Sequence, residues 1–166
     1  MAAPANATLL NLVRGLAGRL LGGKKMLATA ESCTGGLIAK CITDLPGSSA
    51  WFERGWVTYS DRAKRQELGV AAGLLKRHGA VSEQVARAMA RGALQASRTD
   101  LSVAVTGIAG PDGGSEDKPV GTVWIAWAWR QPTGVKVVSR RFVFSGTRDA
   151  VRRQTAAAAL KGLLQG

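Results

Sequence analysis

A serine and a cysteine stand side by side in a segment suited to binding and attacking a polar substrate. Residues 26–32 are predicted to form a short strand that ends at Ser32, and a helix is predicted from about Thr34 to Thr43, opened by Gly35-Gly36. In open α/β sheets, ligands bind at such strand-to-helix junctions. Backbone N–H groups there favour negative charge, whether a phosphate or the oxyanion of a tetrahedral intermediate. A plain helix cap explains the same residues equally well.

A lysine follows the next predicted strand, where it is a candidate base. Residues 55–59 are predicted to form this strand, and Ser60 to cap a short helix. Lys64 would lie in the first turns of that helix, and the nearby charges of Arg62 and Arg65 would lower its pKa. A lysine that loses its proton readily can serve as a general base. The alternative is a basic helix face exposed to solvent.

Two later segments carry candidate binding groups. A glycine-rich loop runs from Thr106 to Gly121 between two apolar stretches, and loops of this length are commonly functional. It lacks the Gly-Lys-Ser/Thr ending of a P-loop. Arg148 begins the last predicted helix, where a bound anion would relieve its conflict with the helix dipole. A long hairpin connection and an Arg148–Asp149 ion pair are the structural alternatives.

The composition limits the classes of partner. The chain has 166 residues, a net charge of +12, one histidine and two cysteines. The size suits one domain, and the cysteines and histidine are too few for a disulfide framework or a zinc site. The charge favours a nucleic acid or a phosphorylated small molecule, but the basic pairs match no nucleic-acid-binding motif. No apolar stretch reaches the ~20 residues that span a bilayer, and the N-terminal segment favours an amphipathic helix over a signal peptide, so we expect a cytoplasmic protein.

Helices and strands alternate along the chain as in α/β proteins. Apolar spacing and turn residues predict helices near 9–21, 34–43, 60–68, 73–77, 82–96 and from 147 onward, and strands near 26–32, 55–59, 101–106, 123–129 and 137–144. The last two strands form a hairpin around residues 131–134. We therefore expect a three-layer α/β/α fold, a single domain over residues 1–166, whose mixed and mostly parallel sheet ends in an antiparallel hairpin.

Taken together, several motifs resemble the CinA C-terminal domain family, which includes stand-alone nicotinamide-mononucleotide deamidases. The matching stretches are 30–36, 46–49, 59–64, 78–82, 106–114 and 118–123, in the order and spacing of the family. The resemblance implies hydrolysis of the carboxamide of nicotinamide mononucleotide to nicotinate mononucleotide and ammonia, in pyridine-nucleotide salvage. It also implies a serine–lysine mechanism that needs no metal and no cofactor.

The resemblance further implies roles for individual residues. Ser32 would be the nucleophile, Lys64 the base that activates it, and Tyr59 would orient the pair or relay a proton. The chemistry agrees, because a serine hydroxyl is a poor nucleophile until a base within hydrogen-bond reach takes its proton. Asp61 departs from the more usual asparagine, and its charge would raise the pKa of Lys64. The implied substrate-binding residues are Ser48, Ser49 and Arg148 for the ribose phosphate, and Thr34, Gly35, Gly36, Thr106 and Gly107 for the pocket wall.

Alternatives remain open at this point. A non-catalytic module would bind a pyridine nucleotide in the same pocket without turnover, and a nucleic-acid-binding protein would show salt-sensitive retention on DNA. Cys33 is an alternative nucleophile, although the only histidine lies far from it in sequence. The family commonly forms dimers, so we expect a homodimer with a small-molecule nucleotide substrate and neither a nucleic-acid nor a membrane partner. The Trp-rich stretch 124–129 fits either the core or an interface.

Overall fold

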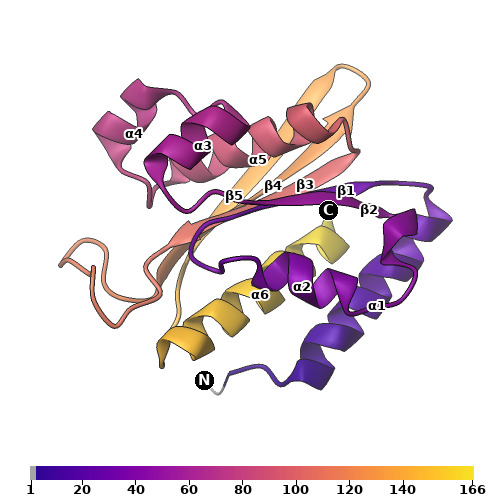
Figure 1. Cartoon of the computed structure of the whole chain (residues 1–166), viewed down its shortest axis with the longest axis horizontal. Coiled ribbons are helices and arrows are strands. Elements are labelled where there is room, and N and C mark those ends of the chain that lie inside the picture. The colour runs from indigo at the N-terminus through magenta and orange to yellow at the C-terminus, as the bar shows by residue number, and fades with distance from the viewer. Residues whose placement is uncertain (1–2) are drawn as a thin grey trace.

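Five strands form one mixed sheet in the order β2-β1-β3-β4-β5 (Figure 1). The computed structural model describes residues 3–166. The strands are β1 (Leu27–Glu31), β2 (Phe52–Val57), β3 (Leu101–Gly107), β4 (Thr122–Gln131) and β5 (Gly134–Val143). β1 pairs in parallel with β2 and β3, whereas β4 runs antiparallel to both β3 and β5. Four strands therefore point one way, and the predicted mixed sheet with an antiparallel hairpin is confirmed.

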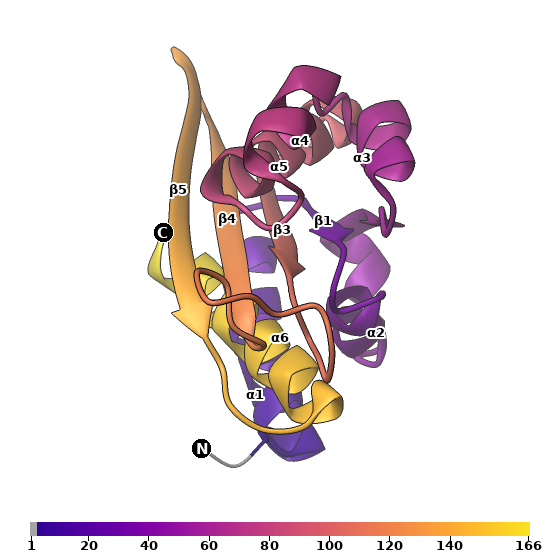
Figure 2. The ribbon, with the colours of Figure 1, turned by 90° about the vertical axis from the view of Figure 1, so that its left-hand side faces the viewer.

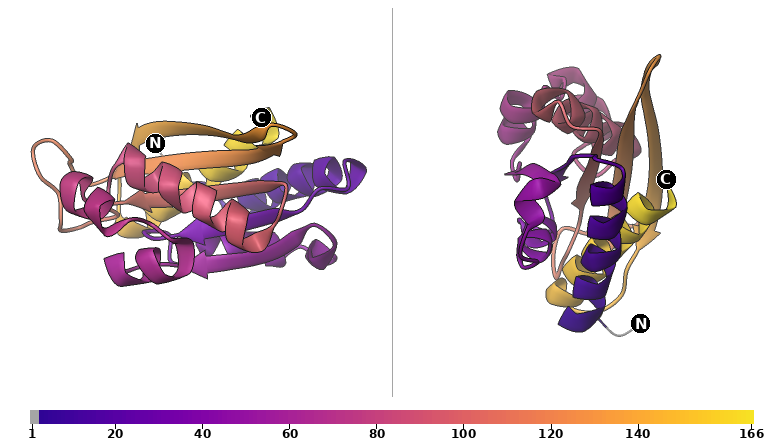
Figure 3. Two further views of the ribbon diagram at one scale, coloured as in Figure 1. Left: turned by 90° about the horizontal axis from the view of Figure 1, so that it is seen from above. Right: turned by 90° about the vertical axis from the view of Figure 1, so that its right-hand side faces the viewer.

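Helices cover both faces of the sheet, which confirms the three-layer α/β/α architecture (Figures 1 and 3). One layer holds α1 (Asn6–Gly22), α2 (Leu37–Thr43) and α6 (Arg148–Gln165), and the other holds α3 (Asp61–Leu68), α4 (Ala72–His78) and α5 (Glu83–Ser97). A short 3-10 helix, η1 (Ser48–Ala50), precedes β2. Within residues 3–166, no helix is both long and apolar enough to cross a membrane.

Side chains of different size point to the two faces of the sheet. Along β3, Val103 and Val105 pack toward α1 and α6, while Ala104 packs toward α5. Small residues on the second face let α5 lie close to the strands, and the Ser102 hydroxyl donates a 2.7 Å hydrogen bond to the carbonyl of Ala90 in α5. The central strands are buried on both sides, as expected of strands between two helical layers.

Several predicted helix starts are confirmed, and one is displaced. The Ser60 and Ser82 hydroxyls accept hydrogen bonds from the N–H groups of Ala63 and Val85, so both serines cap their helices as expected. The helix predicted from Thr34 begins instead at Leu37, because the preceding glycines take positive φ angles and form a turn.

α3 lies against α5 at a glycine. A Cβ atom added to Gly92 of α5 would lie 2.0 Å from the carbonyl oxygen of Leu68, at the end of α3. That oxygen belongs to the backbone, so it cannot move aside without shifting the helix. Gly92 therefore sets how closely the two helices approach.

Gly92→Ala should accordingly destabilise the protein by about 3 kcal/mol, because the methyl group forces α3 away from α5. Urea unfolding followed by circular dichroism measures this change. Gly18→Ala in α1 is the matched control, since nothing lies within 4 Å of its added Cβ, and it should be neutral or stabilising by up to about 1 kcal/mol. Equal stability of Gly92→Ala and the wild type would contradict the packing argument.

Candidate active site

Five segments that are distant in sequence meet at the carboxyl ends of β1 and β3 and line a cavity of about 270 Å³. Figure 2 shows the β3–β4 loop and the start of α6 at this edge of the sheet. The lining residues are Ser32, Cys33, Tyr59, Lys64, Ala80, Val81, Thr106, Gly107, Ile108, Ala109, Gly110, Asp112, Gly113 and Arg148. Such an edge is where open α/β sheets bind ligands.

Ser32 and Lys64 are in direct contact on the wall of this cavity. The Lys64 Nζ atom lies 3.1 Å from Ser32 Oγ, 2.8 Å from the carbonyl oxygen of Thr58 and 3.1 Å from that of Tyr59. The two carbonyl oxygens only accept hydrogen bonds, whereas the serine hydroxyl either donates or accepts. A neutral amine would therefore donate its two hydrogens to the carbonyls and turn its lone pair toward the hydroxyl of Ser32. This is the geometry that a general base requires.

Burial controls the protonation of Lys64. The side chain is fully buried, and no carboxylate of residues 3–166 lies within 4 Å of its amine. Burial lowers the pKa of Lys64, and the charges of Asp61 and Cys33 oppose this shift by smaller amounts. The predicted lowering of the Lys64 pKa is confirmed, but the predicted cause is wrong, since the charges of Arg62 and Arg65 do not contribute to it. The alternative of a solvent-exposed lysine is also wrong.

A carboxylate that the sequence analysis did not single out shapes the turn after β1. Glu31 is buried, and it accepts hydrogen bonds from the Thr34 hydroxyl at 2.6 Å and from the N–H groups of Gly36, Ile38 and Ala39 at 2.8 to 3.1 Å. These bonds fix the chain on both sides of Ser32. The sequence signal that could have found it is an acidic residue that ends a short strand of otherwise uncharged residues.

The predicted pocket-wall residues fall into two groups. Thr106 and Gly107 line the cavity, and the Thr106 hydroxyl donates to the carbonyl of Ala80 at 2.8 Å. Thr34, Gly35 and Gly36 instead build the turn around Glu31 and are not among the lining residues.

Ser48 and Ser49, the serines predicted to bind the phosphate, are not among the residues that line this cavity. They form η1 directly before β2, whereas Ser32 directly follows β1. Because β1 and β2 are parallel, residues that precede one and residues that follow the other lie at opposite edges of the sheet.

Tyr59 and Arg148 meet at the cavity mouth. The Arg148 guanidinium donates to the Tyr59 hydroxyl at 3.0 Å and to the carbonyl of Gly110 at 2.8 Å. The backbone carbonyl of Tyr59 accepts a hydrogen bond from Lys64, whereas the phenol hydroxyl of Tyr59 accepts one from Arg148. No ion pair joins Arg148 to Asp149 within the described part of the chain, which removes the alternative explanation of Arg148.

Cys33 lies beside Ser32 but is poorly suited to attack. Burial raises the pKa of the Cys33 thiol to about 12. The thiolate is the reactive form of cysteine, so this thiol is almost entirely unreactive at neutral pH. Among residues 3–166, no three histidine, cysteine or acidic side chains gather as metal ligands would.

Known proteins resemble this chain in sequence and in fold. Residues 10–166 match the model of the CinA C-terminal domain. The nicotinamide-nucleotide amidohydrolases PncC of Escherichia coli K12 and Pseudomonas putida are 61% and 59% identical over 139 residues, which cover 84% of this chain and 82% and 84% of those proteins. The solved structure of the competence/damage inducible protein CihA from Agrobacterium tumefaciens is 43% identical, with a TM-score of 0.91 over 100% of this chain and 99% of that chain. The chain therefore belongs to the CinA C-terminal domain family.

Proposed function

We propose that this protein hydrolyses the carboxamide of nicotinamide mononucleotide, giving nicotinate mononucleotide and ammonia. The contact between the Ser32 hydroxyl and the buried amine of Lys64, on the wall of a cavity, is the observation that carries the proposal. The names of the similar amidohydrolases support the choice of substrate.

In the first half of the proposed reaction, Ser32 Oγ attacks the carboxamide carbon while neutral Lys64 takes the hydroxyl proton. The resulting ammonium of Lys64 is held by the carbonyls of Thr58 and Tyr59. It then gives this proton to the departing nitrogen as the carbon–nitrogen bond breaks, so ammonia leaves and an ester to Ser32 remains. One group thus serves as base and then as acid.

The second half repeats the proton transfers with water. Lys64 takes a proton from a water molecule whose oxygen attacks the ester carbon, and returns it to Ser32 Oγ as the carbon–oxygen bond of the ester breaks. The products are the free hydroxyl and a carboxylic acid, which releases its proton to solvent and becomes the nicotinate carboxylate, so a single water is consumed. Because the lysine starts and ends neutral, its lowered pKa favours both halves.

Arg148 is our candidate for the phosphate of the substrate. Its guanidinium lines the cavity at the first turn of α6, and a guanidinium binds phosphate through charge-assisted hydrogen bonds. Engagement of the phosphate would compete with its bonds to Tyr59 and Gly110. We place the reaction in cytoplasmic pyridine-nucleotide salvage, in keeping with the two free cysteines, since a reducing compartment preserves thiols.

A non-catalytic nucleotide-binding module is the second candidate. Binding alone needs neither a buried lysine nor its contact with a hydroxyl, and burying an amine without a counter-charge costs stability. The presence of this costly pair favours turnover. A small-molecule cavity that holds these groups likewise favours a nucleotide over a nucleic acid.

Ser32→Ala should abolish ammonia release from nicotinamide mononucleotide, because the attacking oxygen is lost. Cys33→Ala should keep most of the activity, since its thiol is protonated. A coupled glutamate dehydrogenase assay measures the ammonia. Activity that survives in Ser32→Ala and is lost in Cys33→Ala would reassign the nucleophile, and a wild type that binds the nucleotide without releasing ammonia would favour the binding module.

The pH profile should report Lys64. Activity is expected to rise with pH as the amine loses its proton, and burial moves this rise below the usual range of lysine. Asp61→Asn should move the rise to lower pH, because Asp61 raises the pKa of Lys64. Arg62→Gln should leave the rise in place, since Arg62 does not contribute, and a shift to higher pH in this variant would contradict burial as the cause.

Lys64→Arg should lower kcat by about a thousandfold, because a guanidinium does not act as a base at these pH values.

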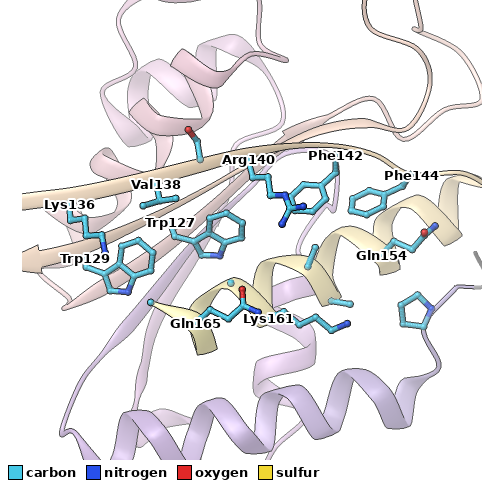
Figure 4. A pocket seen from close by; sticks show the side chains of 16 residues that line it. Trp127, Trp129, Lys136, Val138, Arg140, Phe142, Phe144, Gln154, Lys161 and Gln165 are labelled. Atoms are coloured by element: carbon cyan, nitrogen blue, oxygen red, sulfur yellow. The ribbon is translucent and has the colours of Figure 1, made fainter.

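We also propose that the protein forms a homodimer, as the family resemblance implies. A groove of about 580 Å³ lies between the β4–β5 hairpin and α6, and Figure 4 shows aromatic side chains along it. Trp129, Val138, Phe142 and Phe144 contribute its apolar surface, and Val138 is 43% exposed. A second copy of the chain would cover the apolar side chains of this groove. The volume of the groove exceeds that of the proposed active-site cavity.

Val138→Asp should therefore convert the dimer to a monomer, because a carboxylate would be buried among aromatic rings. Sedimentation equilibrium measures the mass. Val143→Asp lies on the same strand with its side chain on the opposite face, and it should leave the dimer intact. Dissociation by Val143→Asp instead would place the contact on the other face of β5, and a monomeric wild type would refute the dimer.

A further inference from the structure

The cavity carries one acidic side chain that the proposed mechanism does not use. Asp112 lies in the β3–β4 loop and is the only carboxylate among the described residues that line the cavity. Its side chain is exposed and makes neither a hydrogen bond nor an ion pair with any of residues 3–166. Its negative charge is therefore available to a ligand.

The loop that carries Asp112 contacts the cation of the same cavity. The Arg148 guanidinium donates to the carbonyl of Gly110, two residues before Asp112. Arg148 and Asp112 do not pair with each other within 4 Å. This hydrogen bond joins the Arg148 side chain to the loop in which Asp112 lies. Neither the guanidinium nor the carboxylate forms an ion pair within residues 3–166.

The surrounding charge makes this carboxylate significant for a cationic ligand. The chain has 23 lysines and arginines against 11 acidic residues, and the guanidinium of Arg148 lines the cavity. A positively charged ring that enters such a site is repelled unless a nearby anion offsets the field. Tyr59 also lines the cavity, and an aromatic ring attracts a cation that approaches its face.

We propose that Asp112 determines specificity for substrates with a positively charged ring, while Arg148 binds the phosphate at the other end. This rests on the proposed function, in which the substrate is a zwitterion with a cationic pyridinium and an anionic phosphate. The site matches both charges. Reduced nicotinamide mononucleotide keeps the ribose phosphate and the carboxamide but has a neutral ring, so it isolates the contribution of Asp112.

Binding of the oxidised and the reduced mononucleotide to the Ser32→Ala protein, measured by calorimetry at low salt, tests the proposal without turnover. Adding Asp112→Asn should weaken binding of the oxidised form about tenfold and of the reduced form by less than about twofold. Adding Arg148→Gln should weaken both forms, because both carry the phosphate. Asp117→Asn, which removes a charge from the same loop outside the cavity, should change neither.

Equal weakening of both forms by Asp112→Asn, no weakening of either, or no binding of the oxidised form would overturn the proposal. The proposed function is judged separately, by ammonia release from the wild type. A wild type without amidase activity but with the ring-charge difference in binding would refute the reaction and leave the role of Asp112 standing. An active wild type whose Asp112→Asn variant binds both forms normally would support the reaction and refute the role of Asp112.

Discussion

The site depends on the burial of one amine. Lys64 is removed from water, no carboxylate of residues 3–166 lies within 4 Å of its nitrogen, and that nitrogen is hydrogen-bonded to the carbonyls of Thr58 and Tyr59 and the hydroxyl of Ser32. Burial of a charge without a partner is costly, so the environment favours the neutral form. Lys64 is carried by α3, which lies close to α5 where Gly92 admits the backbone of Leu68.

The other partner of the pair is fixed by a different device. Ser32 sits between a strand and a turn, and the carboxylate of Glu31 holds the turn through four hydrogen bonds. The N–H of Ser32 itself donates to the carbonyl of Val105, which ties it to β3. Since β1 and β3 are buried inner strands, the hydroxyl is anchored to the interior of the sheet, whereas the amine comes from a helix on one face.

The remaining groups of the cavity come from loops and from the start of α6. Arg148 links the glycine-rich loop to Tyr59, so two connections that are far apart in sequence are joined at the mouth. The Ser32–Lys64 pair comes from the end of β1 and from α3, whereas the charged side chains of Asp112 and Arg148 come from a loop and from the start of α6. This division is common in α/β enzymes, where loops on a rigid sheet supply binding groups.

By itself, the sequence determined the local features of this protein. The serine caps, the order of helices and strands, the hairpin and the family motifs follow from neighbouring residues, because hydrogen bonds and hydrophobic periodicity act over short distances. Only the tertiary structure decided that Lys64 is buried, that Glu31 holds the turn and that Tyr59 faces Arg148. It likewise placed Ser48 and Ser49 at the far edge of the sheet. The burial of a side chain and the contacts between residues distant in sequence depend on how whole helices and strands pack. The spacing of residues along the chain does not specify this packing.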